Sequence, residues 1–252
     1  MIITTEYVDI AVDGSPMRML VAAPRAAGRY PGILLYSDIF QLTGSTTRAV
    51  MRLAGYGFVV AAPEIYHRIE PVGAAIPFDD AGRDRGLNDA AQTTVTEFDA
   101  DAQAVLDWLS REPRVAAGAL GAAGFCIGGH LAFRAALHRE VGAAVCFYPT
   151  GLHNGKLGKD ADAGSLERAA EISGDLLLVF GALDPHIPED GRAKIAQALR
   201  QAGTKFNVSL YPAEHAFMRD EGPRYDAEAT DQAWAEAIAF YRRVFGSRST
   251  AS

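Results

Sequence analysis

Short apolar runs and longer stretches of helical periodicity alternate along most of the chain. Nearly continuous apolar runs are typical of strands that are buried on both faces of a sheet. Such runs occur at residues 32–36, 58–62, 118–124, 143–148 and 175–180, and a further strand is predicted at 206–211. Helical periodicity occurs at residues 46–54, 97–110, 127–137, 193–201 and 225–245. This alternation predicts an α/β fold, in which helices cover both faces of a mostly parallel central sheet.

The N-terminal segment and one internal segment depart from this alternation. Apolar and polar residues alternate at 4–12 and 17–23 around Asp13-Gly14, which predicts an antiparallel hairpin. Residues 64–94 carry scattered prolines, glycines and charges without a clear period. A long irregular excursion of this kind usually borders the active site in an α/β protein. We expect residues 1–252 to form one domain around a substantial core.

Composition narrows the classes of function. The hydrophobic content of 49% and the charged content of 22% are those of an ordinary globular protein. A formal charge of -7 without a basic run argues against nucleic acid as a partner. No apolar run approaches the roughly 20 residues that span a bilayer, and the first residues lack the pattern of a signal peptide. We therefore expect a cytoplasmic protein, either a monomer or a homodimer, that acts on a small molecule.

The stretch at 124–129 has the sequence Gly-Phe-Cys-Ile-Gly-Gly and lies between a predicted strand and a predicted helix. This is the G-x-nucleophile-x-G form of a nucleophile elbow, whose sharp turn needs neighbours without side chains. The free N–H groups at the start of the helix would favour the thiolate of Cys126. Two alternatives stand beside this reading: a buried structural cysteine and a phosphate-binding turn. The phosphate alternative is weakened because the chain has neither nucleotide-binding glycine motif.

An acid and a histidine follow two later strands. Asp184 comes four residues after the apolar run at 175–180, and His215 comes four residues after the predicted strand at 206–211. Parallel sheets place their sites at the carboxyl ends of the strands. The order nucleophile, acid, histidine is that of the α/β-hydrolases, in which the histidine takes the nucleophile's proton and the acid orients the imidazole. Alone, Asp184 could be a turn residue and His215 a helix contact, so the prediction depends on the conjunction with Cys126.

Several segments together resemble the dienelactone hydrolase (carboxymethylenebutenolidase) family, whose members have the α/β-hydrolase fold and a cysteine nucleophile. The resemblance is carried by residues 37–40 (Ser-Asp-Ile-Phe), 57–66 (Gly-Phe-Val-Val-Ala-Ala-Pro-Glu-Ile-Tyr), 124–129, 181–188 (Gly-Ala-Leu-Asp-Pro-His-Ile-Pro) and 211–217 (Tyr-Pro-Ala-Glu-His-Ala-Phe). It extends from about residue 4 to residue 245. The resemblance implies hydrolysis of a small ester or lactone that bears an acidic group, with no metal and no organic cofactor.

The same resemblance implies roles for further residues. The oxyanion would be bound by the backbone N–H groups of Ile127 and Ile39. Asp38 stands where better-known members carry a glutamate that interacts with the resting cysteine, and the shorter side chain is a departure from the family. Arg219 matches an arginine that holds the substrate carboxylate. Arg85 is the expected second arginine, with Arg83 as its alternative, because this loop aligns poorly.

The remaining candidates are predicted to be structural. Cys146 lies inside an apolar strand, so we expect it to be buried. His67 and His130 show no partner pattern in the sequence. Asp99 and Asp101 are expected to be solvated charges, since no histidine or cysteine joins them in the spacing of a metal site.

Three alternative functions remain open. A glutamine amidotransferase-like enzyme also uses a cysteine elbow, but that class expects His-x-Glu, whereas here Glu214 precedes His215. A carboxylesterase, a thioesterase or a promiscuous organophosphate hydrolase would share the predicted triad. A non-enzymatic binding protein would keep the scaffold without a reactive cysteine.

Overall fold

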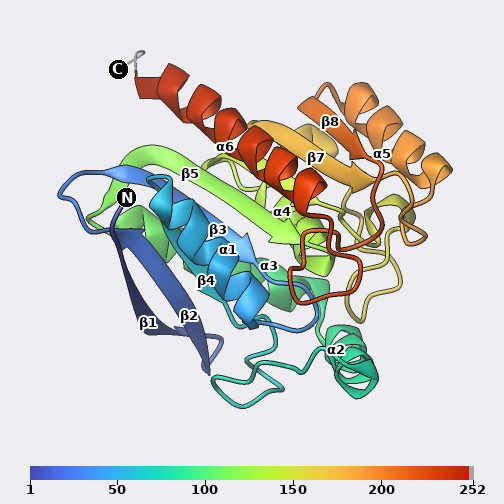
Figure 1. Ribbon diagram of the computed structural model, residues 1–252, viewed down its shortest axis with the longest axis horizontal. Helices are drawn as coiled ribbons and strands as arrows, with labels where there is room; N and C mark the ends of the chain where they lie inside the picture. Colours follow the sequence, from blue (N-terminus) through green and yellow to red (C-terminus); the bar gives the residue numbers. More distant parts are fainter. Residues whose placement is uncertain (250–252) are drawn as a thin grey trace.

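The computed structural model of the protein describes residues 1–249. Its centre is an eight-stranded sheet with the strand order β1-β2-β4-β3-β5-β6-β7-β8 (Figure 1). The strands are β1 (Ile3–Val12), β2 (Ser15–Pro24), β3 (Tyr30–Tyr36), β4 (Val59–Pro63), β5 (Val115–Phe125), β6 (Val141–Phe147), β7 (Asp175–Gly181) and β8 (Lys205–Tyr211). β1 and β2 pair antiparallel, β2 pairs antiparallel with β4, and the other pairs are parallel. The predicted mixed sheet is confirmed.

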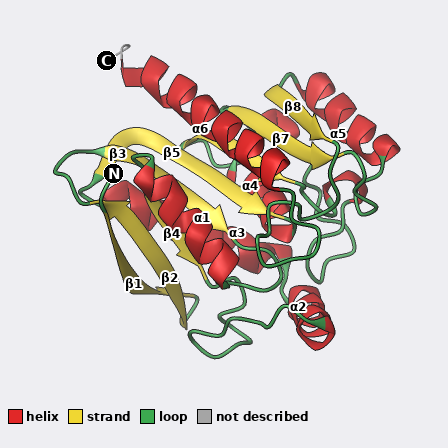
Figure 2. Ribbon diagram, viewed as in Figure 1, coloured by secondary structure: helices red, strands yellow, loops and turns green. Residues whose placement is uncertain are grey.

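Helices cover both faces of this sheet (Figure 2). α1 and α6 lie on the face turned toward the viewer, and α3 and α4 lie on the other face. The helices are α1 (Gly44–Gly55), α2 (Asp80–Gln92), α3 (Val95–Arg111), α4 (Ile127–Ala135), α5 (Glu189–Ala202) and α6 (Ala227–Ser249), with short 3-10 turns η1 (Leu152–Asn154) and η2 (Ala169–Glu171). Along residues 1–249, none of the helices combines the length and apolar character needed to cross a lipid bilayer.

The N-terminal hairpin follows from its turn residues. Asp13 and Gly14 both have positive φ, +50° and +82°, and Val12 pairs with Ser15 across the two-residue turn. Turns of this kind have a backbone twist that matches the twist of the flanking strands. The predicted hairpin is therefore present, and its second strand continues into the main sheet through β4.

The middle strands form the centre of the core. Every residue of β4 and β6 is buried, as their nearly continuous apolar sequences predict. β5 is buried from Leu120 to Phe125, where small residues allow α4 to pack closely on the sheet. The predicted strands and helices all occur, with boundaries that differ by a few residues.

α2 is the helix that the periodicity did not predict. Asp79 caps it, since its side chain accepts the N–H of Gly82 over 2.7 Å. The helix buries only Gly82, Gly86, Asp89 and Ala90, so it has no long apolar stripe to reveal it. Figure 1 shows α2 apart from the sheet, beyond the carboxyl ends of the strands. The excursion at 64–94 therefore contains a helix that borders the candidate site.

Candidate active site

Cys126 lies at the sharp turn between β5 and α4. Its backbone has φ +58° and ψ -118°, outside the conformations that residues with a side chain favour. A Cβ on Gly124 would clash with the carbonyl oxygen of Gly128, and a Cβ on Gly128 would clash with that of Ser37. Gly124 and Gly128 are therefore required, because other backbone segments pass too close to leave room for a Cβ at either position.

Positive φ recurs around this turn. Five non-glycine residues of the described chain have positive φ, and four of them follow the carboxyl ends of β3, β5, β6 and β8. These four are Gln41, Cys126, Tyr148 and Ala216. Such conformations cost of order 1–3 kcal/mol each and concentrate at functional sites. Most of the strained non-glycine residues of the described chain therefore lie at one edge of the sheet.

The structure brings the three predicted triad residues to this edge. His215 Nδ1 lies 2.6 Å from Asp184 Oδ2, and the second oxygen of Asp184 accepts the N–H of His186 over 2.8 Å. The charge of His215 also acts on the sulfur of Cys126 and lowers the pKa of the thiol. Asp184 and His215 are 3% and 5% exposed, whereas Cys126 is half-buried and reaches a cavity. This arrangement can pass a proton between the sulfur and the imidazole.

The electrostatics of the triad favour a thiolate–imidazolium pair. Burial alone would raise the pKa of Cys126, but the charge of His215 and hydrogen bonds from His215, Thr150 and the Ile127 N–H lower it below its ordinary value. Burial would lower the pKa of His215, yet the charge of Cys126 and the hydrogen bond to Asp184 raise it to about 9. By contrast, burial raises the pKa of Cys146 far above its ordinary value.

The two residues predicted to supply the oxyanion donors line the cavity that Cys126 reaches. Ile127 is the first residue of α4, so its N–H has no acceptor within the helix. Ile39 follows β3, and both residues line the same cavity as Cys126. The Ile39 loop is held by Asp38, whose Oδ1 accepts the Phe40 N–H over 2.9 Å. The role of these two backbone N–H groups as oxyanion donors stays a prediction.

Comparison with known proteins places this fold and site in a family. The model of the dienelactone hydrolase family matches residues 17–245. The chain belongs to the dienelactone hydrolase family. It is 38% identical over 242 residues to a Saccharomyces cerevisiae protein named "Putative carboxymethylenebutenolidase", covering 91% of this chain and 88% of that protein. It is 26% identical over 219 residues to the "Carboxymethylenebutenolidase" of Pseudomonas sp. (strain P51), covering 87% of each.

A solved structure gives the same result for the fold. The crystal structure of a "Putative Dienelactone Hydrolase" from Klebsiella pneumoniae subsp. pneumoniae MGH 78578 matches with a TM-score of 0.85 and 27% identity, covering 96% of this chain and 99% of that chain. The protein is therefore a hydrolase of the dienelactone hydrolase family with the α/β-hydrolase fold. The resemblance inferred from the sequence motifs is confirmed.

In this member of the family, Asp38 forms an ion pair with Arg219. The guanidinium of Arg219 also packs against two phenyl rings, 4.8 Å from the centroid of Phe40 and 4.7 Å from that of Phe78. Burial lowers the pKa of Arg219 to about 10. Within residues 1–249, no hydrogen bond joins Asp38 to the sulfur. The expected contact between Asp38 and the resting cysteine is thus replaced by an ion pair with the arginine.

The predicted second arginine lies elsewhere. Arg85 pairs with Glu70, with Nε 2.6 Å from Oε1, and does not belong to the cavity lining. Arg83, its alternative, does line the cavity, as does Arg224. The choice of Arg85 fails because the helical turn of α2 directs residues 83 and 85 to different sides.

Thr150 is the residue near the sulfur that the sequence reasoning missed. Its Oγ1 donates a hydrogen bond to Cys126 Sγ over 3.3 Å. Thr150 lies shortly after β6, at the same carboxyl edge of the sheet as the triad. The rule that singled out Asp184 and His215 could have found it.

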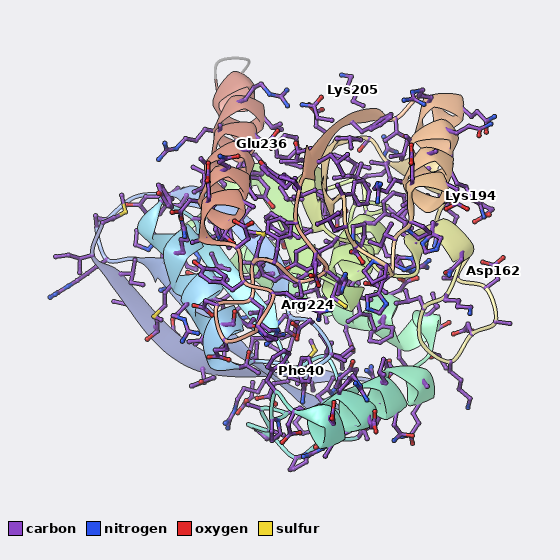
Figure 3. The ribbon with its side chains drawn as sticks, turned by 45° about the vertical axis from the view of Figure 1, so that its right-hand side comes forward. Phe40, Asp162, Lys194, Lys205, Arg224 and Glu236 are labelled. Carbon is purple, nitrogen blue, oxygen red and sulfur yellow. The ribbon has the colours of Figure 1, made fainter. Side chains whose placement is uncertain are left out.

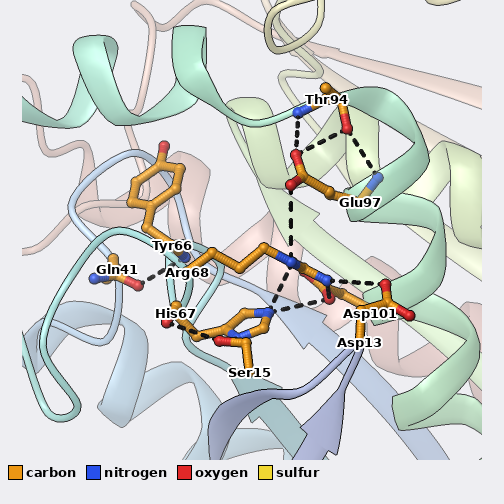
Figure 4. Close-up of polar contacts among 9 residues, drawn as sticks. All are labelled: Asp13, Ser15, Gln41, Tyr66, His67, Arg68, Thr94, Glu97 and Asp101. Carbon is orange, nitrogen blue, oxygen red and sulfur yellow. Dashed lines mark hydrogen bonds and ion pairs between the residues drawn. The ribbon is translucent and has the colours of Figure 1, made fainter.

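A separate polar cluster lies outside the cavity lining (Figure 4). His67 Nδ1 is 3.0 Å from Ser15 Oγ, and its Nε2 is 3.1 Å from Asp101 Oδ1. Arg68 Nη1 lies 2.8 Å from the same Nε2 and also bonds Asp101. The expectations of an unpartnered His67 and a solvated Asp101 are therefore wrong, because Asp101 is 3% exposed and ties the loop after β4 to α3.

A second buried histidine also has partners. His130 Nε2 lies 2.7 Å from Ser165 Oγ, and the guanidinium of Arg134 donates to the same hydroxyl over 2.9 Å. Arg134 is paired in turn with Asp99, which the sequence had assigned to solvated charge. Within residues 1–249, no group of three or more histidine, cysteine, aspartate or glutamate side chains is suited to hold a metal ion. That the enzyme works without a metal or cofactor stays a prediction.

Proposed function

We propose that this protein is a cysteine-dependent hydrolase of small carboxylic esters or lactones, with Cys126 as its nucleophile. The observation that carries the proposal is the arrangement of His215, whose Nδ1 lies 2.6 Å from Asp184 Oδ2 and whose charge acts on the sulfur of Cys126. Nucleophilic catalysis needs a sulfur activated by a base that a third group orients. The family supplies the substrate class, esters and lactones.

The first half of the reaction forms a thioester. The thiolate of Cys126 attacks the carbonyl carbon, and the N–H groups of Ile127 and Ile39 bind the resulting oxyanion. When the tetrahedral intermediate collapses, the bond from carbon to the alcohol oxygen breaks. The imidazolium of His215 gives its proton to that oxygen, and Asp184 holds the ring in the required orientation.

The second half releases the acid. A water molecule gives a proton to the neutral imidazole of His215 as it attacks the thioester carbonyl. Collapse of the second intermediate breaks the bond from carbon to sulfur and returns the thiolate of Cys126. With a lactone, the alcohol and the acid are parts of one product molecule. Each cycle consumes one water and leaves the enzyme unchanged.

Ser165 is the competing nucleophile, because its hydroxyl lies next to an imidazole. Ser165 is 1% exposed and does not line the cavity. Burial and the charge of Arg134 lower the pKa of His130 to about 3, so this imidazole is a weak base. The geometry therefore supports a structural role for the pair and favours Cys126.

Hydrolysis of p-nitrophenyl acetate and of an unsubstituted lactone by three variants tests the proposal. We expect Cys126→Ala to lose activity by several orders of magnitude, while Cys146→Ala, the matched control, keeps the parental rate. Ser165→Ala should also retain activity. Parental turnover by Cys126→Ala, or loss of activity only in Ser165→Ala, would overturn the assignment. A protein without turnover whose Cys126 resists iodoacetamide would instead be a binding protein.

A further inference from the structure

The cavity at Cys126 is large for a small lactone. Its volume is about 820 Å³, near the upper end of pockets that enclose a ligand of drug size. Cys126, Ile127 and His215 line it, and residues of α2 contribute a further part of its lining. In Figure 3, Phe40 lies next to α2, and Arg224 lies farther from that helix, toward the middle of the molecule; both residues line this cavity. There is space beyond the reacting carbonyl for a sizeable substituent.

The second half of α2 contributes apolar residues to the lining, whereas its first turn contributes charged ones. Leu87 and Ala91 stand one turn apart on the helix and both line the cavity, together with Ala90. Leu87 is 52% exposed, and Phe78, just before the helix, is 37% exposed. Large apolar side chains left open inside a concave site are surfaces that a ligand can cover. We call Phe78, Leu87, Ala90 and Ala91 the α2 wall.

The charges around the cavity nearly cancel. Its lining holds four cations, Arg83, Lys156, Arg219 and Arg224, and three carboxylates, Asp38, Asp79 and Asp80. Arg83 already pairs with Asp80 over 3.2 Å. The lining therefore offers little net attraction to an anionic substrate.

Arg219, the arginine expected to hold a substrate carboxylate, is already occupied. It is 4% exposed, and Asp38 takes one of its terminal nitrogens. The other nitrogen, Nη1, has no hydrogen-bond partner among the described residues, yet it is fully covered. A substrate carboxylate would have to displace Asp38 or move the surrounding rings before it reached this guanidinium.

We propose that the site selects neutral esters with a bulky apolar acyl group, which lies along the α2 wall, over small acidic lactones. This preference rests on the proposed function, because the same thiolate and oxyanion donors perform the reaction. Leu87 is then a specificity-determining residue, since its exposed side chain is covered only when a long acyl group is bound. Burial of each additional methylene should raise kcat/KM by up to about fourfold.

The experiment measures kcat/KM for p-nitrophenyl acetate, butyrate and hexanoate and for the mono-p-nitrophenyl ester of adipic acid. Adipate has the same six-carbon chain as hexanoate but ends in a carboxylate. We expect hexanoate to exceed acetate by at least tenfold and to exceed the adipate monoester by at least tenfold. A wild-type preference for acetate or for the adipate monoester would overturn the proposal.

Two matched variants locate the effect. Leu87→Gln should lower kcat/KM for hexanoate about tenfold and leave acetate within twofold. Leu210→Gln, the same change at an exposed leucine of β8, should alter neither ester. Equal losses for both esters in Leu87→Gln would overturn the role of the α2 wall. Parental activity of Cys126→Ala on these esters would overturn the proposed function, which is a different result.

Discussion

The hydroxyl of Thr150 donates a hydrogen bond to the sulfur of Cys126, with 3.3 Å between Oγ1 and Sγ. This bond lowers the pKa of the thiol, in addition to the larger effect of the His215 charge. In this chain Asp38 is paired with Arg219, and the side chain that donates a hydrogen bond to the sulfur is that of Thr150. Thr150 is therefore a positioning residue for the thiolate.

Replacement of Thr150 should reduce the thiolate population. A hydrogen bond to a charged group contributes about 1.5–3 kcal/mol, so we expect Thr150→Val to lower the iodoacetamide alkylation rate of Cys126 at pH 7 about tenfold. Thr150→Ser keeps the hydroxyl and should stay within twofold of the wild type. The measurement is the alkylation rate as a function of pH, whose midpoint should rise in the valine variant alone. Identical profiles for all three proteins would contradict this role.

The pH dependence of turnover should be bell-shaped. The pKa of Cys126 is lowered, so the thiolate is present from a pH below that of an ordinary thiol. The pKa of His215 is raised to about 9, so the imidazolium persists until the pH rises through that value and is then lost. Steady-state kcat/KM should accordingly fall on the alkaline side near pH 9. A rate that keeps increasing above pH 10 would contradict the ion-pair mechanism.

The buried ion pair of Asp38 and Arg219 should matter for stability. Asp38→Asn leaves a buried guanidinium without its counter-charge, which costs about 3–5 kcal/mol in the free energy of unfolding. Asp9→Asn is the matched control, because Asp9 pairs with Arg18 over 3.3 Å at the surface and should cost less than about 1 kcal/mol. Urea denaturation of both variants measures the difference. Equal losses would show that the buried pair is worth no more than an exposed one.

The glycine at the start of α4 should be irreplaceable. A Cβ on Gly128 would collide with the carbonyl oxygen of Ser37, so Gly128→Ala must shift the elbow or the loop after β3. We expect at least a hundredfold loss of esterase activity, since displacement of the reacting groups by about 1 Å can cost that much. Gly246→Ala, where nothing lies within 4 Å of the added carbon, should gain up to about 1 kcal/mol of stability and keep full activity. A fully active Gly128→Ala would contradict the close-packing explanation.

The sequence predicted most of the parallel sheet, since buried strands such as β6 and β7 are continuous apolar runs. It also predicted which loops meet, because a parallel sheet brings the residues after its strands to one edge. α2 escaped prediction because its contacts are made by glycines and alanines rather than by an apolar stripe. A helix that covers a cavity keeps large side chains such as Leu87 exposed, which removes the usual signal of burial.

The spacing of residues in the sequence could not predict which partner each charged side chain contacts. Arg83 and Arg85 are two residues apart, and only the helical conformation of α2 decides which one lines the cavity. The ion pair between Asp38 and Arg219 joins residues far apart in the chain, so the family pattern alone suggested a different partner for each. Local sequence could identify the chemistry of these groups but not the contact each one makes.

Trapping of the covalent intermediate tests the central claim most directly. The wild type is mixed with p-nitrophenyl hexanoate, quenched in acid during turnover, digested and examined by mass spectrometry, with Cys126→Ala treated in parallel. The account predicts a hexanoyl group on the peptide that contains Cys126, and no acyl peptide in the variant. A hexanoyl group on Ser165, or undiminished turnover without any acyl group on Cys126, would contradict it.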